Sequence, residues 1–166
     1  IRQGFAADNQ HLANQLFGQQ NKNLKQVERI LQVRIGSKGL EAQVEGDPIQ
    51  VELARRLLEE LHSLIKEGYP LYPSDFNYAI RILSADSGAS LRDIFLDTVF
   101  ISARKKIISP KSLAQKKYID AIRSNDLVFG IGPAGTGKTY LAMAMAVSSL
   151  TKKEVSRIVL AVSYTH

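Results

Sequence analysis

Eight consecutive residues, GPAGTGKT from Gly132 to Thr139, have the types and spacing of a loop that binds phosphate groups. Glycines let the backbone adopt positive φ and come close to a ligand, so that successive N–H groups can point at an anion. Lys138 would reach the β and γ phosphates, and the Thr139 hydroxyl would ligate Mg²⁺. The residues predicted to bind the nucleotide are Gly132, Pro133, Ala134, Gly135, Thr136, Gly137, Lys138 and Thr139.

The segments on either side of the loop predict how it is positioned. The apolar run from Leu127 to Ile131 predicts a buried strand before the loop, and residues 138–150 predict a helix after it. Residues 156–162 predict a second buried strand, which would make the segment one βαβ unit with a parallel pair. Ser112 predicts the cap of a further helix that ends near Ile122. The predicted fold class is therefore α/β.

Residues 1–68 predict a small α+β domain. Helical spacing of apolar residues covers residues 11–17 and 24–31, and alternation predicts short strands around Val33 and from Leu40 to Val44. Asp47 and Pro48 predict the start of a long helix, which Gly68 would end.

Residues 69–106 predict a connector between this domain and the domain of residues 107–166. Pro70 and Pro73 exclude a continuous helix, and a short helix is expected from about Ser74 to Leu83. Residues 84–90 predict a linker, and residues 95–101 could form a strand.

Composition limits the class of protein. The 166 residues include no cysteine, which excludes a disulfide framework, a thiolate zinc site and a cysteine nucleophile. No apolar run approaches the roughly 20 residues of a membrane span, and no secretory signal is visible behind Ile1. We therefore expect a cytoplasmic protein with no membrane partner. The net charge of +6 indicates nucleic acid or phosphate ligands, or simply a basic surface.

Hydrolysis of a nucleotide needs an acidic residue that holds Mg²⁺ and a group that positions the attacking water. Beyond Thr139 the one acidic residue is Glu154, in a turn where a surface charge is the more ordinary interpretation. The sequence therefore predicts a C-terminally truncated piece of a longer nucleotide hydrolase, with no catalytic residue of its own and no turnover.

Three stretches, SPKSLAQKKYIDAI, LVFGIGPAGTGKTYLAMAMAV and KEVSRIVL, closely resemble the PhoH-like family of bacterial ATPases. The resemblance implies a P-loop ATPase domain related to the superfamily I helicase core, behind a small KH-like RNA-binding domain. In the family the strand that resembles RIVL continues into a Thr-Arg-Pro stretch and a remainder that carries the acidic motif. Here Leu160 is followed by AVSYTH instead.

Helicase-like ATPases often recognise adenine through a glutamine ahead of the phosphate loop, and Gln115 stands at that place. Its amide offers one donor and one acceptor to the adenine edge. The alternative is an exposed helical glutamine.

A KH clamp lies in a GXXG loop between two helices. The stretch GQQN, from Gly18 to Asn21, lies between the two helices predicted at residues 11–17 and 24–31. Asn21 replaces the second glycine of the pattern, and asparagine tolerates the left-handed conformation. The alternative is a KH-like fold that docks protein. A second candidate surface is the basic run from Arg104 to Lys117. The residues predicted to contact RNA are Gly18, Gln19, Gln20, Asn21, Lys22, Lys25, Arg104, Lys105 and Lys106.

We therefore expect a protein that binds ATP and Mg²⁺ and is associated with RNA. Its full-length form would be an ATPase, with a second copy or an RNA-processing protein as further candidate partners. One alternative is an RNA- or protein-docking module with a vestigial nucleotide-binding tail. A small-molecule kinase ranks last, because no acceptor-binding motif is found.

Overall fold

The computed structural model describes residues 1–101 and 107–161 and shows a mixed α/β protein with small antiparallel sheets. The chain forms two compact units, Ile1–Leu96 and Asp97–His166. Each unit has its own buried core and is described by itself.

The first unit contains a three-stranded sheet of β1 (Arg2–Ala6), β2 (Arg34–Lys38) and β3 (Glu41–Glu45). The order is β1-β3-β2, with both pairs antiparallel, and Val44 of β3 lies opposite Gln3 and Ile35. Ala42 and Val44 are fully buried, whereas the side chains that alternate with them are not. The alternation seen in the sequence therefore identified β3 correctly, but β1 was not predicted.

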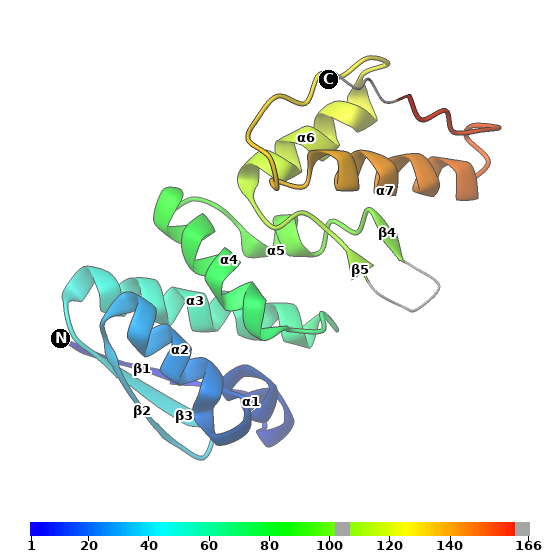
Figure 1. Cartoon of the computed structure of the whole chain (residues 1–166). Helices are drawn as coiled ribbons and strands as arrows, with labels where there is room; N and C mark the ends of the chain where they lie inside the picture. The colour runs from blue at the N-terminus through cyan, green and yellow to red at the C-terminus, as the bar shows by residue number, and fades with distance from the viewer. Residues whose placement is uncertain (102–106, 162–166) are drawn as a thin grey trace. The chain divides into compact units, whose positions relative to one another are not determined.

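Helices α2 (Lys22–Leu31) and α3 (Pro48–Lys66) pack against the sheet (Figure 1). Helix α1 (Gln10–Phe17) packs against α3 and reaches β1 through the rings of Phe5 and Phe17, whose centroids lie 6.4 Å apart. The Asp47 carboxylate accepts a hydrogen bond of 2.9 Å from the Ile49 N–H and so caps α3, as its sequence predicted. The apolar face of α3 supplies much of the core, with six residues fully buried: Val51, Ala54, Leu57, Leu58, Leu61 and Leu64.

Two further helices, α4 (Pro73–Ala85) and α5 (Leu91–Phe95), belong to the first unit and lie within the predicted connector. The Gln26 amide donates to the Pro73 carbonyl at 3.2 Å, and the Glu60 carboxylate accepts from the Leu91 N–H at 2.7 Å. Phe76 and Phe95 are fully buried. Apolar burial thus incorporates residues 69–96 into the first unit, and α5 was not predicted.

The second unit contains β4 (Phe100–Ile101), β5 (Ile107–Ile108), α6 (Leu113–Ser124) and α7 (Lys138–Thr151). β4 and β5 pair antiparallel, and α6 and α7 lie side by side (Figure 1). Its core joins four buried residues from these elements and the segment before β4, namely Val99, Ile119, Leu141 and Ala144.

The predicted parallel strand pair is wrong for the residues that the structure describes. Neither residues 127–131 nor residues 156–161 form a strand. Their apolar side chains are exposed, Phe129 to 80%, Ile131 to 95% and Val159 to 79%. A strand exists through hydrogen bonds to a neighbouring strand, and neither segment has one among the described residues.

Candidate functional site

The glycine-rich loop joins the end of α6 to the start of α7, and α7 begins at Lys138. Gly135 and Gly137 have φ of 76° and 85°, in the left-handed region that favours glycine. An added Cβ at Gly137 would lie 3.2 Å from the amide nitrogen of Gln115. The left-handed backbone therefore favours glycine at position 137, and a side chain there would also press on Gln115.

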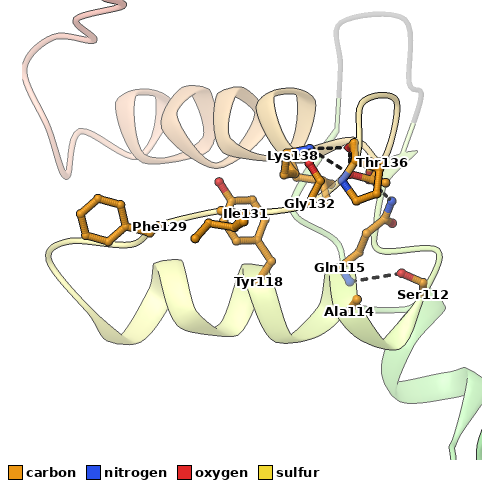
Figure 2. Close-up of a pocket in the computed structure, with 12 residues that line it drawn as sticks. Ser112, Ala114, Gln115, Tyr118, Phe129, Ile131, Gly132, Thr136 and Lys138 are labelled. Atoms are coloured by element: carbon orange, nitrogen blue, oxygen red, sulfur yellow. Dashed lines mark hydrogen bonds between the residues drawn. The ribbon is translucent and has the colours of Figure 1, made fainter.

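Lys138 turns back onto the loop that precedes it. Its ammonium group donates to the Gly132 carbonyl at 2.8 Å, to the Pro133 carbonyl at 2.6 Å and to the Thr136 hydroxyl at 3.2 Å (Figure 2). The Thr136 hydroxyl in turn donates to the Pro133 carbonyl at 3.0 Å. These bonds hold the loop as a compact ring around the ammonium group.

Gln115 of α6 lies beside the loop. Its amide oxygen accepts from the Lys111 N–H at 2.7 Å, and its amide nitrogen donates to the Thr136 carbonyl at 3.1 Å. The Ser112 hydroxyl caps α6 by accepting from the Gln115 N–H at 3.2 Å. Both ends of the Gln115 side chain therefore bind backbone, and the side chain connects the start of α6 to the loop.

A pocket of about 410 Å³ extends from the loop along α6. Its lining combines loop residues with Gln115 and Tyr118 of α6, Leu141 of α7 and Ile131 ahead of the loop (Figure 2). Sites for small ligands have this order of size and this mixture of apolar walls and a few polar groups. Sequence reasoning missed Tyr118, although its position three residues after Gln115 places both on one face of a helix.

An ionic cluster fixes the opposite side of α6. The Asp97 carboxylate, only 13% exposed, lies 2.6 Å from the Arg123 guanidinium and 3.1 Å from the Lys116 ammonium group. Burial raises the pKa of Asp97, but hydrogen bonds from Arg123 and Lys116 outweigh burial and hold the pKa below its ordinary value. Asp120 joins the cluster through Lys116 at 2.6 Å.

In the first unit, the GQQN loop lies between α1 and α2, as predicted, with residues 19–21 in a short turn. Gln20 and Asn21 have φ of 53° and 60°, so asparagine occupies the left-handed conformation in place of glycine. The Asn23 amide donates to the Leu16 carbonyl at 3.0 Å and fills the space beside Gly18, where an added Cβ would lie 2.9 Å away.

The candidate basic residues divide between described and undescribed parts of the chain. Lys22 and Lys25 are exposed at the start of α2. Arg104, Lys105 and Lys106 lie outside the described residues. Residues 1–101 and 107–161 contain no helix long and apolar enough to cross a membrane, and no group of three His, Cys, Asp or Glu side chains suited to a metal ion.

Fold and site together define a mixed α/β protein with a glycine-rich loop of the phosphate-binding pattern at the start of a helix. Residues 107–164 match the family model described as "PhoH-like protein". The chain belongs to the PhoH-like protein family.

Named relatives extend the similarity over most of the chain. A PhoH-like protein of Mycobacterium leprae (strain TN) is 41% identical over 145 residues, which cover 87% of this chain and 41% of the relative. A PhoH-like protein of Bacillus subtilis (strain 168) is 38% identical over 159 residues, 93% of this chain and 50% of the relative. The chain thus spans half or less of the length of these relatives. No solved structure shows a significant match.

Proposed function

We propose that the chain binds ATP with Mg²⁺ through residues 132–139, and that it is part of an RNA-associated ATPase with a P-loop domain and a KH-like domain. The observation that carries this proposal is the glycine-rich loop, which turns through Gly135 and Gly137 into the first turn of α7 beside Lys138. The membership of the PhoH-like family supports it. The absence of cysteine fits a cytoplasmic location.

The residues of the loop fit a triphosphate. The first turn of α7 leaves backbone N–H groups without partners inside the helix, and these attract an anion together with the positive end of the helix dipole. No heavy atom outside the neighbouring residues lies within 4 Å of a Cβ position at Gly135, so the backbone is open to a ligand there. Lys138 can exchange carbonyl acceptors for phosphate oxygens, which form stronger, charge-assisted hydrogen bonds.

Mg²⁺ would be held mainly by phosphate oxygens and water, with the Thr139 hydroxyl as the ligand from the loop. The described residues provide no cluster of acidic side chains for it. Glu154 is exposed beyond the end of α7. We therefore propose that the 166-residue chain binds nucleotide without multiple turnover.

Calorimetric titration with Mg-ATP tests the proposal. Lys138→Ala removes the ammonium group and should weaken binding at least about tenfold, because a charge-assisted hydrogen bond contributes about 1.5–3 kcal/mol. Lys117→Ala, an exposed lysine of α6, is the matched control and should leave affinity unchanged. Circular dichroism must show that both variants are folded. Equal ATP affinity of wild type and Lys138→Ala would contradict the proposed binding. If the wild-type chain released phosphate over multiple turnovers and Lys138→Ala did not, the proposed absence of turnover would be wrong.

RNA binding by the first unit rests on a separate observation, the left-handed turn at residues 20–21 between α1 and α2. A KH clamp grips nucleic-acid backbone with a loop in this position, and Lys22 and Lys25 place positive charge beside it. The alternative is a KH-like unit that docks protein.

Fluorescence anisotropy with single-stranded RNA at two salt concentrations separates these alternatives. The double variant Lys22→Glu/Lys25→Glu should weaken binding and flatten its dependence on salt, since each lost phosphate contact reduces the slope. Lys152→Glu, beyond α7, is the control. Asn21→Gly should keep the turn and bind at least as tightly, because glycine removes side-chain bulk from the backbone contact. Unchanged affinity in the double variant would favour protein docking.

A further inference from the structure

The pocket beside the phosphate loop has an aromatic wall that the phosphate-binding pattern does not explain. Tyr118 projects from α6 one helical turn beyond Gln115 and lies next to Ile131 on the segment that leads into the loop (Figure 2). The ring is partly buried, because it packs against the core that contains Ile119 and Leu141. It also lines the pocket. The ring is therefore both supported by the core and available to a ligand.

Gly130 makes room for this ring. A Cβ at Gly130 would lie 3.1 Å from Cε2 of Tyr118 and 3.2 Å from both Cζ and the phenol oxygen. Gly130 has no positive φ that would require glycine for backbone reasons. A ring that packs against a core gives way less readily than a flexible side chain does, so a Cβ at Gly130 would press on the ring. The lack of a side chain at Gly130 is thus matched to the position of Tyr118.

The position of the ring relative to the loop determines what it can contact. Phosphates held at the start of α7 leave the rest of a nucleotide to extend away from the loop. The pocket runs from Lys138 and Thr136 past Gln115 to Tyr118, so a ligand anchored at the loop would extend along α6 to the ring. Aromatic side chains bind nucleobases by stacking, whichever base is present.

We propose that Tyr118 forms the wall on which the base of the bound nucleotide lies, and that Gly130 is required to leave the ring in this position. The proposal rests on the proposed nucleotide binding and adds a base-contacting residue to it. It differs from a role of Gln115 in recognising adenine, because a stacking wall accepts adenine and guanine alike.

Binding of Mg-ATP, Mg-GTP and Mg-tripolyphosphate to wild type and variants tests the proposal. Tripolyphosphate fills the loop without a base. Tyr118→Leu should weaken ATP and GTP binding about fivefold to 150-fold, the range that one base–aromatic stack provides, and should leave tripolyphosphate binding unchanged. Gly130→Ala should act in the same direction, because its Cβ displaces the ring. Tyr118→Phe keeps the wall and should bind as wild type does. Tyr140→Leu, at a tyrosine 54% exposed on α7, is the control.

A direct readout uses the lack of tryptophan in the chain. Tyr118→Trp introduces a single fluorophore at the wall, which ATP should quench and tripolyphosphate should not. The proposal would be overturned if ATP affinity were unchanged in Tyr118→Leu and Gly130→Ala, or if the tryptophan responded equally to both ligands. Neither result would contradict the proposed nucleotide binding. A wild-type chain that binds neither ATP nor tripolyphosphate would refute the proposed function, and the role of Tyr118 with it.

Discussion

Replacing Asp97 by asparagine should destabilise the second unit, because Asp97 joins the segment before β4 to α6. The carboxylate is nearly buried and receives hydrogen bonds of 2.6 Å and 2.8 Å from Arg123, while Lys116 lies 3.1 Å away. Asparagine keeps the shape of the side chain and one acceptor, but it loses the negative charge. Among the described residues, the acidic contact left to Arg123 and Lys116 would then be Asp120, which is 47% exposed.

The expected loss is about 2 kcal/mol in the free energy of unfolding. Breaking a fully buried ion pair costs about 3–5 kcal/mol, and exposed pairs contribute about 0.2–1 kcal/mol. Asp97 is nearly buried, but Arg123 is 37% exposed and Lys116 25%, so water compensates part of their loss. The cost therefore lies between the two limits.

The same contacts predict a dependence on pH. The pKa of Asp97 is lower in the folded chain than its ordinary value of about 3.9. A carboxyl group with a lowered folded pKa stabilises the fold above its unfolded pKa and loses this contribution as the pH falls through the folded value. The difference in stability between wild type and Asp97→Asn should therefore be constant from pH 7 to 5 and shrink below about pH 4.

Urea unfolding in a Tyr140→Trp background measures this difference for the second unit alone, since the chain has no other tryptophan. Tyr140 is exposed on α7, so the reporter should disturb little. Asp126→Asn, an exposed acid just beyond α6, changes the net charge equally and should cost little. An equal midpoint for Asp97→Asn and Asp126→Asn, or a stability difference unaffected by pH down to 3, would refute the reasoning.

Three further predictions concern single side chains. Burial lowers the pKa of His62 despite the nearby Asp8 carboxylate. The neutral imidazole therefore stabilises the fold above the unfolded pKa of about 6.5, and this contribution is lost as the pH falls below that value. Hydrogen exchange of α3 should become faster at the lower pH, and His62→Gln should remove this dependence on pH. Leu141 is a core residue only 3% exposed, so Leu141→Ala leaves a cavity in the core of the second unit. The substitution should lower the free energy of unfolding, measured in urea, by about 2–5 kcal/mol. Gln115→Glu replaces the amide that donates to the Thr136 carbonyl at 3.1 Å by a carboxylate, which repels that carbonyl and should weaken tripolyphosphate binding. If tripolyphosphate binding were unchanged and the ratio of ATP to GTP affinity altered, the result would instead support adenine recognition by Gln115.

The sequence predicted most helices of the two units, α5 excepted, because their signals are local. Apolar spacing and the Asp47 cap located α3, and the Ser112 cap located α6. Strand β1 has no comparable signal, since of its five residues only Phe5 is buried. Its place depends on pairing with β3, far along the chain.

The strand predicted at residues 127–131 failed for the converse reason. Its residues have strong β propensity, but propensity only states that a segment fits a sheet. Leu127, Phe129 and Ile131 remain exposed because the described residues provide no strand to pair with them. The loop still turns as predicted, since its shape depends on local contacts of Lys138, Thr136 and Gln115 and not on a sheet.

Helix α6 connects the ionic cluster to the pocket, and this connection can be measured. Gln115 and Tyr118 contact the loop and the pocket, whereas Lys116 and Arg123 bind Asp97. Asp97→Asn should therefore loosen the position of α6 and weaken ATP binding even while the unit is folded. In a double-mutant cycle, Tyr118→Leu should cost less ATP affinity in the Asp97→Asn background than in wild type, because a displaced ring has less contact to lose. Additive effects would mean that Asp97 stabilises the unit without setting the position of the wall.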